Sequence, residues 1–462
     1  MNELKNEPIA LIATVGTGGE KNPVWEAIAF SVEQHKPEFV CWLCSEKTAQ
    51  ETLPKVCQAV NNTLGFRYLA ENYTGEETEE IIDLPVMPEK VQETHISQNP
   101  DDVQKLFLEY LSVIDRIRSS RPGCRIVADF TSGTKAMSAA LTMAATARKV
   151  EVLSYMTGPR DASGRATTTT HAIAFEPDQI YAQGMLDRAM DYLNQNEFQT
   201  AITLAEQARQ GLRLENPELS RKAFLIKGLA MAYKKWDLFL YKDARDTLIS
   251  TARQSEWIPE FRKKLEANLA FLEVCVNGDR DARGKAIDPE WTNERLLDLY
   301  LNAKRRFETG GYDDCVSRCY RLVEYIAQQR LYLHYGIETD NVPFWTLKKT
   351  EAREYFNNKS RMGLEDAYRL LEMEFDDELG RAFVREYVGN GSWKERKGPL
   401  SGALSSRNQS LLAHGFSPIS ERNAQTILEI IADWLSRWIP QMETQMTKGT
   451  FNRVDYTMFK NH

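Results

Sequence analysis

The sequence has few of the residue types that build extracellular or metal-centred proteins. Its 462 residues include only seven cysteines and six histidines. An odd number of scattered cysteines in a chain of this size argues against a disulfide framework and fits a reducing cytosol. His35, His95 and His171 have no carboxylates at a helpful ligand spacing, and no set of Cys and His residues completes a zinc pattern. We therefore predict that the protein has no metal site.

Long apolar runs are also missing. No stretch approaches the roughly 18 apolar residues that a membrane span needs, and the polar residues 1–7 carry no signal-peptide core. These features predict a cytoplasmic protein with no membrane partner. The formal net charge of −8 argues against stable binding to duplex DNA, because such proteins need a broad basic surface. A small local site for a phosphate-bearing ligand is still compatible with this charge.

Cys41 and Cys44 show the C-x-x-C spacing that is found in zinc and redox sites. They lie inside the continuous apolar run FVCWLC, residues 39–44. Because no second pair of Cys or His residues is nearby, this pattern indicates a buried strand rather than a metal or redox centre.

Residues 8–160 alternate short β-rich runs with helical patterns. This alternation predicts an α/β domain with a mostly parallel, doubly wound sheet. Ligands of such sheets bind at the carboxyl ends of the strands. The predicted strands are residues 8–15, 38–44, 80–86, 124–130 and 150–156, and the predicted helices include residues 24–34, 101–119 and 136–148.

From about Pro177 the strand pattern disappears and helical patterns follow. The stretch 277–284 is polar and contains glycine, which predicts a linker between two helical parts. Beyond Pro289, long amphipathic patterns predict an all-α domain. The sequence therefore predicts an α/β part, a helical middle part and a C-terminal all-α part, with the boundaries 1–176, 177–288 and 289–462.

Two of the predicted strands end in loops that are rich in glycine and hydroxyl residues. Residues 16–19 (GTGG) follow the first strand, and residues 131–135 (TSGTK) connect a later strand to a helix. Neither loop is a dinucleotide fingerprint or a Walker A loop. Backbone N–H groups, the helix dipole, hydroxyls and one lysine can still bind an anion. The second loop can equally be a plain strand–helix turn. Ser45 ends a neighbouring strand on the same rim.

A pair of basic residues marks the C-terminal part. Arg407 and His414 stand seven positions apart, which brings them to nearly the same face if residues 405–414 form one helix. Ser405 or Ser406 is then the expected N-cap. A permanent cation beside a titratable imidazole can perform acid–base chemistry on a phosphodiester. The same pair can also be a solvated helix end.

The helix predicted over residues 312–333 carries several charged side chains. Arg318, Arg321 and Glu324 lie on it within two turns. They either form ion pairs within the helix or line a cleft.

Taken together, these motifs resemble a known protein family. The segment 129–137 (DFTSGTKAM) and the Gly/Thr loop after the first strand resemble those of CRISPR-associated Rossmann fold (CARF) domains. Residues 310–324, with Gln328 and Gln329, resemble the C-terminal half of the CARF proteins grouped as the 02710 family. The HEPN ribonuclease motif of that half is matched by Arg407, Asn408 and His414, at the upper limit of the Arg-to-His spacing.

This resemblance implies a sensor joined to a nuclease. Residues 1–176 would be a Rossmann-like CARF domain that binds cyclic oligoadenylate, residues 177–288 a helical linker domain, and residues 289–462 a HEPN ribonuclease domain. The ligand would lie between the CARF domains of a homodimer, with tetra-adenylate favoured and hexa-adenylate open. The residues expected to contact it are Thr14, Gly16, Thr17, Gly18, Ser45, Thr131, Ser132, Gly133, Thr134 and Lys135.

The implied reaction is metal-independent cleavage of single-stranded RNA in the antiviral defence of type III CRISPR systems. His414 would act as general base or acid, Arg407 would stabilise the transition state, and Asn408 would hold the phosphate. The products would be a 2′,3′-cyclic phosphate and a 5′-hydroxyl. Two alternatives stay open. The HEPN domain is non-catalytic and the chain works by binding, or the CARF domain is a ring nuclease that degrades its messenger through Thr14, Ser132 and Lys135.

Overall fold

The computed structural model describes residues 7–17, 24–64, 68–71, 90–158, 171–175, 177–210, 216–357, 359, 361–409 and 415–460. Its contacts divide the chain into two compact units. The first unit is Met1–Met185 with Gln207–Ser220, and the second is Leu186–Glu206 with Arg221–His462. The predicted boundaries at 1–176, 177–288 and 289–462 stay a prediction.

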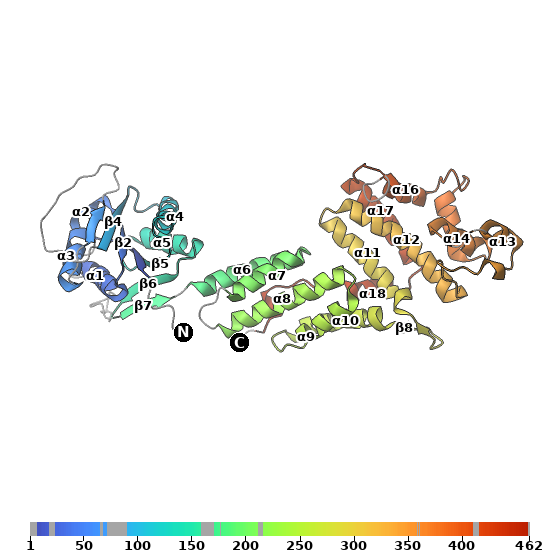
Figure 1. The fold of residues 1–462 in the computed structure, drawn as a ribbon, viewed down its shortest axis with the longest axis horizontal. Coiled ribbons are helices and arrows are strands. Elements are labelled where there is room, and N and C mark those ends of the chain that lie inside the picture. Colours follow the sequence, from blue (N-terminus) through green and yellow to red (C-terminus); the bar gives the residue numbers. More distant parts are fainter. Residues whose placement is uncertain are drawn as a thin grey trace. The chain divides into compact units, whose positions relative to one another are not determined.

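A seven-stranded sheet forms the centre of the first unit (Figure 1). Its strand order is β3-β4-β2-β1-β5-β6-β7, and every neighbouring pair is parallel except β6 and β7. The predicted mostly parallel α/β fold is therefore confirmed. The strands are β1 (Ile9–Thr14), β2 (Phe39–Ser45), β3 (Tyr68–Glu71), β4 (Lys90–Ser97), β5 (Arg125–Asp129), β6 (Val152–Thr157) and β7 (His171–Phe175).

Helices cover both faces of this sheet (Figure 1). Ala10 and Ile12 of β1 pack in one core with helices α4 (Val103–Ser120) and α5 (Lys135–Ala147). The alternate residues of the same strand pack in a second core with α1 (Val24–His35) and α3 (Leu53–Leu64), while α2 (Glu46–Glu51) follows β2. Because a central strand here is buried on both faces, its sequence is continuously apolar.

Cys41 and Cys44 confirm this arrangement. Both are buried in β2, with Cys41 in the core of α4 and α5 and Cys44 in the opposite core. Burial raises the pKa of the Cys44 thiol to about 12. A thiol held protonated in this way is a poor nucleophile and a poor metal ligand, so the prediction of a buried strand is confirmed.

Some strands of the sheet were not predicted. The strand expected at 80–86 lies outside the described residues. Strand β4 was missed because its sequence, KVQETHIS, is polar and carries no run of apolar residues. Strand β7 was missed because it is a short, exposed edge strand, so no buried face imposes a pattern on it.

Helices make up nearly all of the described chain after residue 177, as predicted. Those of the middle part are α6 (Asp178–Asn194), α7 (Phe198–Gln210), α8 (Pro217–Asp237), α9 (Tyr241–Ala252) and α10 (Pro259–Asn277). Those of the C-terminal part are α11 (Asn293–Glu308), α12 (Tyr312–Tyr335), α13 (Thr350–Phe356), α14 (Leu364–Met373), α15 (Glu378–Phe383), α16 (Pro399–Gln409), α17 (Glu421–Ser436) and α18 (Met442–Gly449).

Helix α12 is central to the C-terminal part, since it packs against α11, α14, α16 and α17. The predicted linker 277–284 is instead part of a small hairpin of β8 (Asp279–Arg280) and β9 (Ala286–Ile287). Gly278 has φ +81, and a Cβ there would meet the Ile287 carbonyl at 2.1 Å. Gly278, one of the two glycines in the predicted linker, therefore ends α10 and leads directly into the hairpin.

The end of the chain returns to the middle helices. The ring of Phe451 stacks on Tyr233 at 4.4 Å between centroids and also contacts Trp236. The Asn194 side chain donates to the Val454 carbonyl and accepts from its N–H, both at 2.8 Å. The core of the middle helices is thus completed by residues that follow α18.

Candidate functional site

The loops after β1 and β5 lie side by side because these two strands are parallel neighbours, with Ala13 opposite Asp129. The chain runs from β1 to β2 on one side, and later enters β5 on the other side of β1. The strand order therefore reverses between β1 and β5. In open α/β sheets, the crevice at such a switch point is the usual ligand site.

Direct contacts hold these two loops together. The Gly16 N–H donates to the Ser132 hydroxyl at 2.6 Å, and the Thr14 hydroxyl donates to the Ser132 carbonyl. A Cβ on Gly16 would lie 2.6 Å from the Gly133 nitrogen, and Gly133 has φ +91. The predicted residues Thr14, Gly16, Ser132 and Gly133 are thus brought together, with the hydroxyls of Thr14 and Ser132 bonded between the loops.

Two further predicted threonines fasten the second loop to its surroundings. The Thr131 hydroxyl accepts from the Met156 N–H at 2.7 Å, which ties the loop to β6. Thr134 is the N-cap of α5: it accepts from the Met137 N–H and donates to the Pro100 carbonyl. The first helical residue, Lys135, is exposed.

The remaining predicted ligand residues border the same rim. Thr17 is exposed after the first strand, and Gly18 lies outside the described residues. Ser45 caps α2 through reciprocal hydrogen bonds with Thr48, at the end of β2 beside β1. The exposed side chains of Thr17 and Lys135 are therefore better placed to meet a ligand than the buried hydroxyls.

Sequence reasoning missed a buried polar group beneath these loops. The Asp129 carboxylate accepts from the Ser31 hydroxyl at 2.6 Å and from the Thr131 N–H at 2.9 Å. Burial raises the pKa of Asp129, and burial lowers the pKa of the nearby His35, whose Nε2 lies 2.8 Å from the Ser154 hydroxyl. The sequence did contain a signal for this buried group, namely an acidic residue at the end of an apolar strand.

Arg407 lies on α16, which packs against α12. The expected N-cap at Ser405 or Ser406 is wrong. Helix α16 begins at Pro399, where a proline loses no helical hydrogen bond, and both serines lie within the helix. The Arg407 guanidinium lies over the Tyr320 ring, 4.8 Å from its centroid. His414 and the side chain of Asn408 lie outside the described part, so their roles stay predictions.

The charged residues of α12 form pairs within the protein. Arg321 donates to Glu324 at 2.8 Å and to Gln328 at 2.7 Å. Arg318 donates to Asp314 at 2.8 Å. Of the two expectations for these side chains, the structure supports internal ion pairs.

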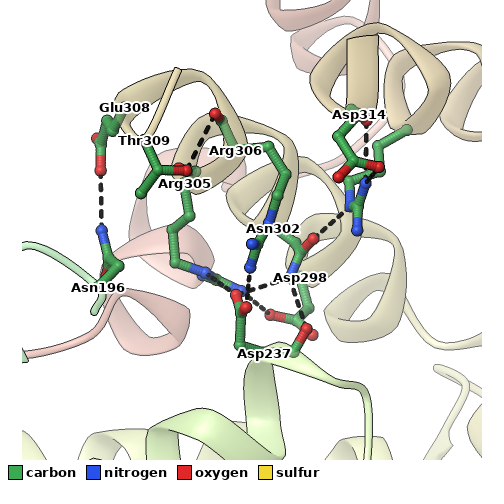
Figure 2. Close-up of polar contacts among 10 residues, drawn as sticks. Asn196, Asp237, Asp298, Asn302, Arg305, Arg306, Glu308, Thr309 and Asp314 are labelled. Atoms are coloured by element: carbon green, nitrogen blue, oxygen red, sulfur yellow. Dashed lines mark hydrogen bonds and ion pairs between the residues drawn. The ribbon is translucent and has the colours of Figure 1, made fainter. Parts of the chain in front are cut away.

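A buried polar network joins α8 to α11 and α12 (Figure 2). Asp237, at the end of α8, accepts from Arg305 at 2.8 Å, from Asn302 at 2.8 Å and from Arg306. The side-chain amide oxygen of Asn302 in turn accepts from Arg318 of α12. This network was not predicted, because Asp237 lies more than 60 residues from Asn302, Arg305 and Arg306 in the sequence.

Asp298 completes the buried network (Figure 2). It is fully buried, and one carboxylate oxygen lies 3.5 Å from Arg305. Burial raises the pKa of Asp298 to about 6, although the Arg305 charge opposes this effect. The network thus contains more than one buried ion pair, and these contacts join the end of α8 to α11.

Neither metal clusters nor membrane helices occur in the part of the chain that the structure describes. Within the described ranges, no group of three or more His, Cys, Asp or Glu side chains is placed to hold a metal ion. Among the described helices, none combines the length and the apolar character that crossing a membrane requires.

Comparison with known proteins connects this architecture to a family. Residues 287–437, which include Arg407, match the family model of the Csm6 HEPN domain. The CRISPR system endoribonuclease Csm6 of Thermus thermophilus is 26% identical over 357 residues, or 71% of each protein.

A solved structure shares the fold over nearly the whole chain. Enterococcus italicus Csm6, bound to cyclic hexa-2′-fluoro-hexa-dAMP, matches with a TM-score of 0.50 at 11% identity. The match covers 96% of this chain and 98% of the other. Together with the HEPN match, it confirms the resemblance of this chain to the CRISPR-associated CARF–HEPN ribonucleases.

Proposed function

We propose that this protein is a ribonuclease of type III CRISPR antiviral defence that cuts single-stranded RNA when cyclic oligoadenylate binds to it. The match of residues 287–437 to the Csm6 HEPN domain is the observation that carries this proposal. The T. thermophilus relative, named as a CRISPR system endoribonuclease, supports it. In this proposal the protein acts in the cytoplasm.

The proposed chemistry uses only side chains. His414 takes the proton of a ribose 2′-hydroxyl, whose oxygen attacks the adjacent phosphorus, and a histidine also protonates the departing 5′-oxygen. Arg407 stabilises the charge that builds on the phosphate oxygens, and Asn408 holds the phosphate. The products are a 2′,3′-cyclic phosphate and a 5′-hydroxyl. Two subunits of a homodimer contribute one Arg/His pair each to a shared cleft.

The proposed activator site is the rim formed by the loops after β1 and β5. The start of α5 offers backbone N–H groups and the Lys135 charge, which suit phosphates. The cyclic hexanucleotide analogue bound to E. italicus Csm6 supports a ligand of this class. We favour cyclic tetra-adenylate as the activator of this chain and keep cyclic hexa-adenylate as the other candidate.

The decisive experiment measures cleavage of single-stranded RNA with each cyclic oligoadenylate in turn, with and without EDTA. We expect cleavage only with one ring size, undiminished by EDTA. Inhibition by EDTA that added metal reverses would contradict the metal-independent reaction. Binding without cleavage of any RNA would favour a sensor with a non-catalytic HEPN domain.

The variant His414→Ala separates the two proposed sites. We expect it to bind cyclic oligoadenylate normally and to cut no RNA, because the proton-transfer group is gone. Cleavage by this variant would overturn the assignment of the nuclease site. Incubation of the same variant with the ligand, followed by chromatography, tests the ring-nuclease alternative, since degradation would then come from the CARF domain.

A further inference from the structure

Tyr320 holds a defined position relative to Arg407. It lies on α12, and the packing of α12 against α16 brings its ring under the Arg407 guanidinium at 4.8 Å. The ring is half-buried, so the contact forms in a partly dehydrated place. Cation–π attraction is stronger at such places than at fully exposed ones.

The charges around Tyr320 keep its phenol neutral. Burial raises the pKa of the phenol, and the Glu324 and Glu365 charges add to this effect, while Arg407 and Arg396 oppose it. The contact with Arg407 is therefore one of a cation with a neutral ring.

We propose that Tyr320 is a positioning residue for the nuclease reaction, whose ring fixes the guanidinium of Arg407 in the orientation that meets the phosphate. This inference rests on the proposed function. The Arg407 guanidinium lies over the Tyr320 ring. A guanidinium donates through N–H groups in its own plane, so a contact with an aromatic ring does not use the donors that bind phosphate oxygens. Loss of the ring removes one of the contacts that restrict this long side chain, so the guanidinium samples more rotamers and is less often in the productive position.

The test compares Tyr320→Leu with Tyr320→Phe in full-length protein, using saturating activating cyclic oligoadenylate and a single-stranded RNA substrate. We expect Tyr320→Leu to lower kcat about tenfold with KM within about twofold, because the interaction acts mainly in the transition state. Tyr320→Phe keeps the ring and should retain both constants within about twofold. Equal losses in both variants would assign the effect to the hydroxyl and overturn the proposal.

A matched control removes a similar contact elsewhere in the same part of the chain. Lys359 and Arg369 lie 4.3 Å and 4.9 Å from the centroid of the Tyr355 ring, so Tyr355→Leu deletes cation–ring contacts that do not involve Arg407. We expect its kcat to equal that of the wild type. If Tyr355→Leu loses as much activity as Tyr320→Leu, the loss is a general packing effect and the proposal is wrong.

Changing the electron density of the ring while keeping its size separates cation–π attraction from packing, because packing alone would leave kcat unchanged. Replacing Tyr320 with 3,4,5-trifluorophenylalanine keeps the size of the ring and weakens cation–π attraction. We expect kcat below that of Tyr320→Phe with an unchanged melting temperature, and an equal kcat would overturn the proposal even if Tyr320→Leu fails to fold.

The variant Arg407→Ala is measured in the same assay to test the proposed nuclease site itself. If it retains activity, the proposed nuclease site itself fails, whereas an inactive Arg407→Ala beside a fully active Tyr320→Leu refutes only the role of Tyr320.

Discussion

Gly16 shows how a residue without a side chain can set the spacing of two loops. Its N–H is bonded to Ser132, and the space where a side chain would begin is filled by the backbone of Gly133. The two loops can approach this closely only because Gly16 has no Cβ. The separation of the loops, and with it the width of the candidate ligand site, is set at this residue.

The variant Gly16→Ala should therefore spread the two loops. We expect the first unit to lose about 1–3 kcal/mol of stability, and cyclic oligoadenylate to bind at least tenfold more weakly. Thermal unfolding and ligand titration measure the two effects. Gly184→Ala is the matched control, since a Cβ on Gly184 in α6 meets nothing within 4 Å. If both variants behave alike, the close approach of the loops is unimportant.

Asp298 gives the second unit a pH-dependent stability. Burial raises the pKa of Asp298 to about 6, whereas an unfolded Asp titrates near 3.9. Between these two values the folded protein keeps a proton that the unfolded chain has released. The contribution of this group to the free energy of unfolding is therefore full below about pH 4 and is lost as the pH rises through about 6.

Asp298→Asn should remove this dependence, because the amide does not titrate in the range. Relative to the wild type, the variant should gain about 3 kcal/mol in the free energy of unfolding as the pH rises across the window. Urea unfolding followed by tryptophan fluorescence at several pH values measures it. Asp433→Asn, at an exposed side chain, is the control. Parallel curves for wild type and Asp298→Asn would contradict the expectation.

At the scale of helices, strands and loops, the sequence was most informative where one short pattern of residues determines the local structure. Strands β1, β2, β5 and β6 were predicted because burial on both faces forces continuous apolar runs. The site loops were predicted because their residues are contiguous with those strands. The polar strand β4 and the exposed β7 have no such constraint, which is why they were missed.

Contacts between distant elements could not be predicted in the same way. The pairing of Asp237 with Arg305 joins residues 68 positions apart, and nothing local to either residue marks it. The stacking of Tyr320 on Arg407 is likewise a result of how α12 packs on α16. For the candidate nuclease site, the motif identified Arg407, and only the packing revealed what lies beneath it.

The stability of the second unit should depend on the buried charge of Asp237, which connects α8 to α11. Asp237→Ala leaves Arg305 buried without this partner, and we expect a loss of about 3–5 kcal/mol from the second unit. Chemical denaturation measures the change. Glu206→Ala is the matched control, because it breaks the more exposed pair of Glu206 with Lys227 and should cost less than about 1 kcal/mol. Similar losses in both variants would show that the buried network is unimportant.

At the scale of the whole molecule, we expect ligand binding to stabilise the first unit whether or not the nuclease site is active. At a hundredfold excess over Kd, a ligand adds about 2.7 kcal/mol to the unit that binds it. We expect cyclic oligoadenylate to raise the melting temperature of wild type and His414→Ala equally, and that of Lys135→Ala by much less. A full shift in Lys135→Ala would remove the α5 terminus from the proposed ligand site.

The return of the chain end to the middle helices has a consequence for synthesis of the protein. Tyr233 and Trp236 are synthesised more than 200 residues before Phe451, the ring that packs against them. The Asn268 side chain likewise donates to the carbonyls of Lys448 and Thr450, which are synthesised later. A growing chain therefore carries an incomplete core among its middle helices, and the second unit can reach its final packing only after the residues that follow α18 have been synthesised.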